Sequence, residues 1–177
     1  VSLHPSGAAV YGSGSSNSIA RYAIGSAGSL VTPTDTYTSS VSFCGGVWFS
    51  PSGSRLYSGC GTTARLTEGP SASVQPSGPF FPSQVRSLAE SVGGRIALIP
   101  ASSFSPSIAE KEVVLLASDG FQEVGRLAIP SFTVGTQTWR GEGRWVFFNA
   151  SGSTLHVVYQ AEQASGILED FAVQTYS

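Results

Sequence analysis

One short pattern recurs four times along this chain of 177 residues: an apolar segment, a turn of small residues that contains glycine, and a second apolar segment. The clearest copy runs from Val47-Trp-Phe-Ser through the turn Pro51-Ser-Gly-Ser to Arg55-Leu-Tyr-Ser. Short apolar segments on either side of a glycine turn are typical of antiparallel hairpins. Sustained helical periodicity is missing, and the best helical candidate, residues 84–91, is short and lacks an N-cap. The sequence therefore predicts an all-β chain.

The spacing of the repeats indicates how the hairpins are grouped. The turn glycines at positions 7, 53, 94 and 152 are 46, 41 and 58 residues apart. One four-stranded blade of a β-propeller occupies roughly 40–50 residues. We therefore expect a single β-propeller domain over residues 1–177, with about four four-stranded blades at approximately 1–40, 41–82, 83–134 and 135–177. A β-sandwich is the alternative, because it also uses many short strands.

The turn residues carry a resemblance to a known group of repeats. Residues 51–57, which read Pro-Ser-Gly-Ser-Arg-Leu-Tyr, and more weakly residues 5–11 resemble the first hairpin of a YVTN/WD40-like β-propeller blade. Residues 113–127 resemble the second hairpin of such a blade. The chain departs from the pattern in having Ser where the turn Asp is usual, and it lacks the Gly-His and Trp-Asp pairs of WD40 repeats. The resemblance implies an architecture and no particular protein.

Four blades can close into a small ring or form half of a ring of seven or eight blades. A single blade cannot bury both faces of its sheet, so it needs neighbours on both sides. In an open half, the outer faces of the first and last blades would be large apolar patches that drive pairing. The second arrangement therefore predicts self-association of the chain.

The two cysteines, Cys44 and Cys60, lie on either side of the clearest hairpin. If Ser50 pairs with Arg55, the cysteines lie almost opposite each other, and a bulge at one of the nearby glycines would align them. Opposed Cβ atoms in antiparallel strands are about 4.5–5.5 Å apart, close to disulfide range. A disulfide is predicted, with two buried free thiols as the alternative. Because a disulfide indicates an oxidising compartment, we expect an extracellular or periplasmic protein.

The charge and composition of the chain argue against several classes of partner. Charged residues make up 11% of the chain and the net charge is -2, which argues against a nucleic-acid binder, because such a protein needs a basic face to neutralise phosphates. No apolar run reaches the length of a membrane span. His4 and His156 have no Asp, Glu or Cys at ligand spacing, so no metal or other cofactor is expected. The carboxylate pairs Glu110 with Glu112 and Glu169 with Asp170 are interpreted as solvated residues.

The densest candidate site is residues 139–145, Trp-Arg-Gly-Glu-Gly-Arg-Trp, which we expect in a loop between blades. Tryptophan and arginine are enriched in protein-contact hot spots, and aromatic faces also stack on sugars. In the alternative interpretation Trp145 packs in the core, and Arg140 and Glu142 form a local ion pair. The predicted partner-binding residues are Trp139, Arg140, Glu142 and Arg144, together with Arg65 in a loop of the second blade.

The function predicted from the sequence is an exported, non-enzymatic β-propeller domain that binds a protein or a cell-surface glycan through its rim loops. Because propellers host many activities, the fold does not decide between functions. A hydrolase or lyase on the same scaffold is one alternative, and a structural half of a larger propeller is another.

Overall fold

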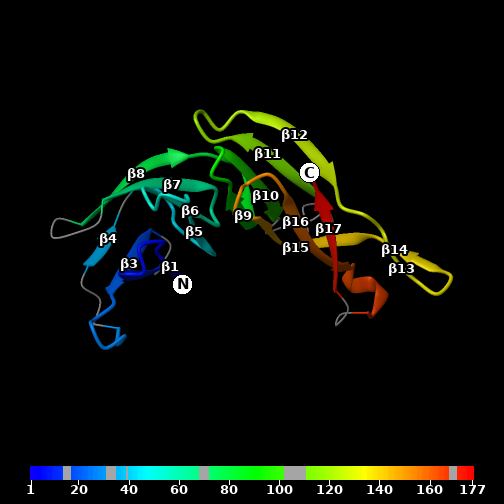
Figure 1. Ribbon diagram of the computed structural model, residues 1–177, viewed down its shortest axis with the longest axis horizontal. Coiled ribbons are helices and arrows are strands. Elements are labelled where there is room, and N and C mark those ends of the chain that lie inside the picture. The colour runs from blue at the N-terminus through cyan, green and yellow to red at the C-terminus, as the bar shows by residue number, and fades with distance from the viewer. Residues whose placement is uncertain (14–16, 31–34, 39, 68–71, 102–110, 168–170) are drawn as a thin grey trace. The chain divides into compact units, whose positions relative to one another are not determined.

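The computed structural model describes residues 1–13, 17–30, 35–38, 40–67, 72–101, 111–167 and 171–177. This part of the chain is almost entirely β-structure, as predicted, with one short 3-10 turn, η1 (Gln163–Ser165) (Figure 1). Within these ranges no helix is long and apolar enough to cross a membrane. The helical candidate at residues 84–91 is wrong, because this segment forms strand β9 (Gln84–Glu90), where Val85, Ser87 and Leu88 are buried by tertiary packing.

The chain divides into two compact units, residues 1–85 and 86–177. The first unit contains two four-stranded antiparallel sheets, each built from consecutive strands. The first sheet comprises β1 (Ser2–Leu3), β2 (Ala9–Ser13), β3 (Ser18–Ala23) and β4 (Asp35–Thr38). The second sheet comprises β5 (Val47–Phe49), β6 (Arg55–Ser58), β7 (Thr62–Thr67) and β8 (Ser73–Pro79).

The first two sheets pack against each other through alternate residues of their strands. In the first sheet Ala9, Tyr11 and Ile19 are completely buried, and in the second sheet Leu56 and Ala64 are completely buried in the same cluster. Successive side chains of a strand point to opposite faces, so this cluster accounts for one face of each sheet. The core of the first unit is therefore a layer between two sheets.

In the first and second sheets, turns of the same kind join the first two strands. The amide of Gly7 donates to the His4 carbonyl at 2.8 Å, and the amide of Gly53 donates to the Ser50 carbonyl at 2.9 Å. The pairing of Ser50 with Arg55 on which the disulfide prediction depends is present, because the Ser50 amide donates to the Arg55 carbonyl at 3.0 Å. The buried imidazole of His4 then connects the two turns, because its Nε2 is 3.0 Å from the Gly53 carbonyl oxygen.

The predicted disulfide between Cys44 and Cys60 is confirmed. It closes beside the hairpin of β5 and β6, where the Gly59 amide donates to the Gly46 carbonyl at 2.8 Å. A Cβ at Gly59 would lie 2.8 Å from the Cys44 carbonyl oxygen and 3.1 Å from the Gly45 Cα. The two cysteine-bearing segments therefore approach so closely that only glycine fits at position 59.

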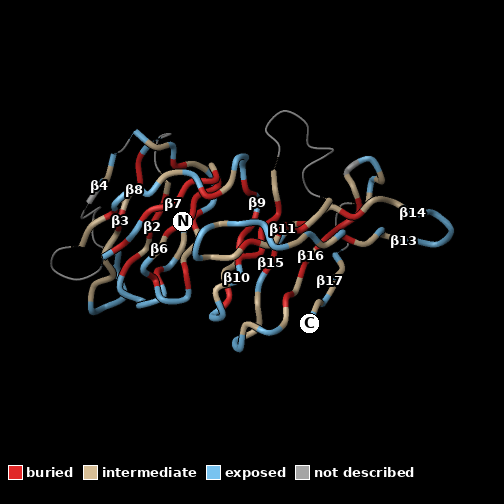
Figure 2. Tube along the Cα trace, turned by 90° about the horizontal axis from the view of Figure 1, so that it is seen from above, coloured by how far each residue is buried: buried red, intermediate tan, exposed pale blue. Residues whose placement is uncertain are grey.

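The second unit contains the third and fourth sheets and a separate hairpin. The third sheet comprises β9, β10 (Arg95–Ala101), β11 (Glu112–Ala117) and β12 (Glu123–Ala128). The fourth sheet has three described strands where the repeat predicts four: β15 (Gly141–Phe148), β16 (Leu155–Ala161) and β17 (Phe171–Tyr176). Along the chain, the segment that follows the third sheet and precedes the fourth forms an exposed hairpin of β13 (Phe132–Val134) and β14 (Gln137–Trp139) (Figure 2).

The third and fourth sheets bury a second core between them. Ala97, Ile99 and Val113 of the third sheet share one buried cluster with Val146 and Val157 of the fourth. A hydrogen bond also joins the sheets, because the amide of Val146 donates to the Ser87 hydroxyl at 3.1 Å. Each unit thus consists of two sheets packed face to face.

The His4 contact predicts different costs for the same substitution in the two turns. Both glycines have left-handed φ angles, +72° at Gly7 and +73° at Gly53. A Cβ at Gly7 meets nothing within 4 Å, but a Cβ at Gly53 would lie 2.4 Å from Nε2 of His4. His4 cannot move away easily because it packs against Tyr11 and Phe49, with ring centroids 6.0 and 5.2 Å away.

We therefore expect Gly7→Ala to cost about 1–2 kcal/mol of unfolding free energy from the backbone alone. Gly53→Ala should cost about 1–3 kcal/mol more, because the added methyl group overpacks the site. Urea unfolding of both variants measures the difference. Equal losses would show that His4 does not hold the second turn as described.

Candidate functional site

The fourth sheet has one face in the core and one face open to solvent. Val146, Val157 and Tyr159 point into the core, and the residues between them point away from it. We call this open side the aromatic face. Its members, identified from the strand register and their exposure, are Trp145, Phe147, His156, Val158, Phe171, Val173 and Thr175.

Large apolar side chains dominate the aromatic face. The exposed fractions are 53% for Trp145, 46% for Phe147, 49% for Phe171 and 59% for Val173. In the described part of the chain, these three rings are the only aromatic residues among the exposed large hydrophobic residues. Single exposed apolar residues are normal on a protein surface, but a group of them on one face marks an interaction site.

The rings of this face are arranged in two pairs. Trp145 and Phe171 come from the two outer strands of the sheet, with ring centroids 5.6 Å apart. Phe147 stacks on His156 of the central strand at 5.2 Å and 25°. His156 Nδ1 is 3.2 Å from the Thr175 hydroxyl, so the second pair is also fixed to β17. These contacts connect side chains from all three strands of the sheet.

A polar cluster borders the aromatic face beside Trp145. The Arg144 guanidinium binds Glu142 through Nη2 and Oε2 at 2.9 Å, and its Nε donates to the Gln160 Oε1 at 2.5 Å. The Glu142 and Arg144 side chains are only 12% and 13% exposed, and Gln160 is buried. Gln160 is paired with Phe171 on β17, so the cluster and the aromatic rings are parts of one surface.

Arg140 and Trp139 lie on the segment that leads into β15. The Arg140 guanidinium is 3.3 Å from the Glu162 carboxylate, and the Arg140 amide donates to the same carboxylate at 3.2 Å. Trp139 is half-buried opposite Phe132 in the β13–β14 hairpin. Its indole Nε1 is buried and has no hydrogen-bond partner among the described residues. These two residues therefore belong to the same unit as the aromatic face without being part of it.

Arg65 lies in the first unit, whereas the other four predicted residues lie in the second unit. It is exposed on β7, directly between Arg55 on β6 and Gln75 on β8. The expectation that Arg65 lies in a loop is wrong, since it is part of strand β7.

Three expectations about residues 139–145 are corrected by the structure. The segment is not a loop, because β15 begins at Gly141. Trp145 is not a core residue, because the bulge between Gly143 and Trp145 sets its side chain on the open face. Arg140 pairs with Glu162, and Glu142 pairs with Arg144 instead.

Phe147, Phe171 and Val173 are surface residues that were not predicted from the sequence. The alternation in residues 171–176, Phe-Ala-Val-Gln-Thr-Tyr, was the available signal, because a period of two predicts a strand with two different faces. The pattern alone does not show which of those faces meets solvent.

The candidate carboxylate pairs lie partly outside the described residues, which include neither Glu110 nor Glu169 nor Asp170. Glu112 binds Arg126, whose guanidinium also makes a bidentate contact with Glu123 at 2.7 and 2.8 Å. The hydrogen bond from Arg126 lowers the pKa of Glu123. Among the described residues, no group of three His, Cys, Asp or Glu side chains could hold a metal ion.

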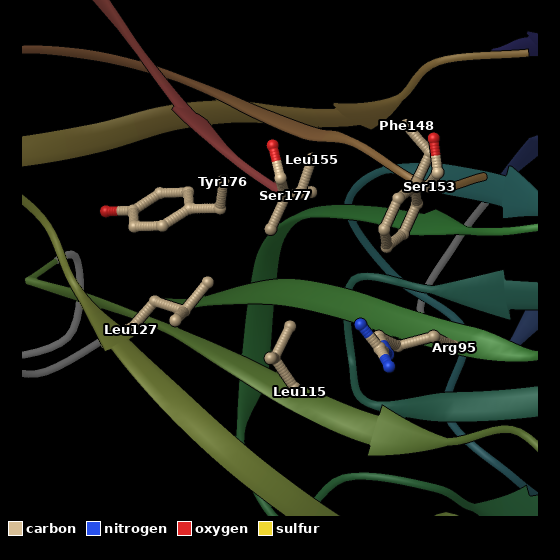
Figure 3. Close-up of a pocket in the computed structure, with 8 residues that line it drawn as sticks. All are labelled: Arg95, Leu115, Leu127, Phe148, Ser153, Leu155, Tyr176 and Ser177. Atoms are coloured by element: carbon tan, nitrogen blue, oxygen red, sulfur yellow. The ribbon is translucent and has the colours of Figure 1, made fainter. Parts of the chain in front are cut away.

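A small pocket lies between the third and fourth sheets (Figure 3). Its volume is about 90 Å³, the space of roughly three water molecules and well below the roughly 300 Å³ of small-molecule sites. The lining residues are Arg95, Leu115, Leu127, Phe148, Ser153, Leu155, Tyr176 and Ser177. We interpret the pocket as a packing defect in the outer part of the core.

The buried charge pair of the polar cluster predicts a measurable contribution to stability. Glu142→Gln leaves the Arg144 guanidinium with a neutral partner in a nearly closed site, at a cost of about 1–3 kcal/mol of unfolding free energy. Glu123→Gln is the matched control, because it removes a carboxylate from an arginine that is open to solvent. Chemical denaturation should show a clear loss for the first variant and little change for the second. If both variants unfolded like the wild type, the Glu142–Arg144 pair would not contribute to stability.

Tyr176 predicts a loss of stability at alkaline pH. Burial raises the pKa of its phenol above the ordinary value of 10.0, and Tyr159 adds to the shift. Its hydroxyl donates to the Ala128 carbonyl at 2.8 Å, which requires the protonated form. The folded state therefore holds this proton more tightly than the unfolded state, so the stabilisation is complete below pH 10 and is lost above it. Tyr176→Phe should flatten the fall in unfolding free energy above pH 10; an unchanged profile would contradict this.

Comparison with solved structures identifies the architecture. The chain is similar to the Cps50 (Swd1) β-propeller domain of Myceliophteria thermophila, with a TM-score of 0.60 and 10% identity over 86% of this chain and 44% of that one. It is also similar to a candidate 6-phosphogluconolactonase from Bacteroides uniformis, with a TM-score of 0.51 and 16% identity over 90% of this chain and 47% of that one. No protein-family model and no curated protein matches the chain.

These similarities concern the fold alone, and the chain spans less than half the length of either solved chain. Together with the four sheets of consecutive antiparallel strands, they confirm the expected propeller and the resemblance to WD40-like propellers. The chain has a β-propeller fold and not that of a β-sandwich.

Proposed function

We propose that this chain forms blades of a β-propeller scaffold in an exported protein, and that it binds a protein partner through the aromatic face of its fourth sheet. The observation that carries the proposal is the set of three half-exposed rings, Trp145, Phe147 and Phe171, on one side of a sheet whose other side is core. Half of three aromatic side chains is on the order of 300 Å² of apolar surface. Water solvates such a surface poorly, so covering it favours association.

The polar cluster favours a protein over a glycan as the partner. Sugars are recognised by rings together with polar groups that remain available for the hydroxyls. Here Glu142 and Arg144 bind each other and are almost closed to solvent, and Gln160 accepts a hydrogen bond from Arg144. An apolar centre beside paired charges is typical of a protein–protein interface, in which Trp and Arg residues often contribute most of the binding free energy.

We also propose a location for the protein and boundaries for its blades. The Cys44–Cys60 disulfide supports an extracellular or periplasmic location. We further propose that the four sheets are blades of one propeller, with boundaries near 1–40, 41–82, 83–134 and 135–177. The hydrolase or lyase hypothesis stays a prediction from the fold class, and no described contact favours it over binding.

The proposal predicts that the aromatic face binds an apolar probe and contributes little to folding. The dye anilinonaphthalene sulfonate should bind the native chain, and the double substitution Trp145→Ser with Phe171→Ser should remove most of its fluorescence. The thermal midpoint should stay within a few degrees, because these side chains are half-exposed. Val124→Ser, which removes an apolar residue of 58% exposure from the third sheet, is the matched control and should leave dye binding unchanged.

Two outcomes would contradict the proposal. Collapse of the double variant to an unfolded state would show that the rings are core residues. A shift in tryptophan fluorescence on titration with chitohexaose, lost in the double variant, would show that the face is a glycan site.

A further inference from the structure

The second sheet carries two arginines side by side on the face that points away from the core. Arg55 of β6 is paired with Arg65 of β7, and Arg65 is paired with Gln75 of β8. Their neighbours Leu56 and Ala64 are buried in the core of the first unit, so the three polar side chains lie on the opposite face. Like charges directly opposite each other destabilise a sheet, so folding alone gives no reason for this pair of arginines.

A pocket of about 390 Å³ lies beside these strands, and we call it the arginine pocket. Its volume is within the range of small-molecule sites, roughly 300–1,000 Å³. Both arginines line it, together with the hydroxyl or amide side chains of Ser54, Thr67, Ser73 and Gln75. No Asp or Glu of the described part of the chain is among its lining residues. The arginine pocket therefore combines positive charge with polar groups that can donate hydrogen bonds.

The two arginines differ in the contacts that they make within the chain. Nη1 of Arg55 donates to the Tyr57 hydroxyl at 3.2 Å, which holds this side chain along its own strand. Arg65 is exposed, and its guanidinium makes no hydrogen bond or ion pair with any residue that the structure describes. Arg126 of the third sheet, by contrast, is bound by two carboxylates. The five N–H donors of the Arg65 guanidinium are therefore available to a ligand.

We propose that the arginine pocket binds a tetrahedral oxyanion, the phosphate or sulfate group of a ligand. A guanidinium is a planar fork that binds an oxyanion through two parallel hydrogen bonds. Residues opposite each other in antiparallel strands have Cα atoms about 4.5–5.5 Å apart, so the forks of Arg55 and Arg65 can reach the same anion. The bound anion would also neutralise the repulsion between the two guanidinium groups.

The geometry favours a tetrahedral anion over a carboxylate. A carboxylate has two oxygens in one plane, and a single guanidinium fork occupies both of them. A phosphate or sulfate group has further oxygens out of that plane, which leaves acceptors for the second arginine and for hydroxyls such as those of Thr67 and Ser73. These two hydroxyls are 2.7 Å apart at the edge of the pocket. The site lies in the first unit, so the inference does not depend on the aromatic face.

NMR titration of the ¹⁵N-labelled 177-residue chain tests the proposal, with the backbone amides of Arg55, Arg65 and Gln75 as reporters. Sodium phosphate, sodium sulfate and sodium acetate are titrated separately at about pH 8, where phosphate is mostly a dianion. Sodium chloride keeps the ionic strength constant, because screening alone alters exposed charges. Phosphate or sulfate should shift the reporters along a saturating curve with a dissociation constant in the millimolar range, about 1–10 mM, and acetate should bind more weakly.

Arg65→Gln should weaken the binding of phosphate and sulfate at least about 10-fold, because it removes the charge-assisted hydrogen bonds of one fork. Arg126→Gln is the matched control, since it removes the same charge from an exposed strand of another sheet and should leave the titration unchanged. The amide spectrum of each variant without added anion shows whether it is folded.

The three titrations also separate the possible ligands. Tighter binding of phosphate supports the proposal and indicates a phosphate ester, and tighter binding of sulfate supports it and indicates a sulfate ester. Acetate that binds as tightly as both would overturn the tetrahedral site. Reporters that do not saturate by about 50 mM of either dianion, or a folded Arg65→Gln variant that binds like the wild type, would overturn the arginine pocket as an anion site.

Discussion

The burial of one apolar sheet face against another is the interaction on which this structure depends. An antiparallel strand turns alternate side chains to opposite faces, so a sheet with apolar residues on both faces needs a neighbour on each side. In the first unit Tyr11 and Ile19 are covered by the second sheet, and in the second unit Val146 and Val157 are covered by the third. Each such buried side chain contributes about 1.5–3 kcal/mol.

The proposed site follows from the same constraint. In the fourth sheet only one of the two faces is covered by a neighbouring sheet, because Tyr159 points into the core whereas Trp145 and Phe171 point to solvent. The charged residues at the border do not compensate for this, since Glu142 and Arg144 already bind each other. The open face therefore has rings at its centre and a closed charge pair at its edge.

Sequence patterns predicted the parts of the fold that depend on neighbouring residues. The turn at Gly53, the pairing of Ser50 with Arg55 and the disulfide all follow from local spacing, and all three are present. The candidate site was predicted less well, because the exposure of Trp145 depends on a bulge and on which sheets surround β15. Both are tertiary properties, and the local pattern of aromatic residues is the same in a core strand and in an open face.

The most direct test of the two faces of the fourth sheet is hydroxyl-radical footprinting along β15, read by mass spectrometry. We expect an alternation, with Trp145 and Phe147 oxidised rapidly and Val146 and Phe148 protected. Equal protection of all four residues, or rapid oxidation of Val146, would contradict the claim that the fourth sheet has one covered and one open face.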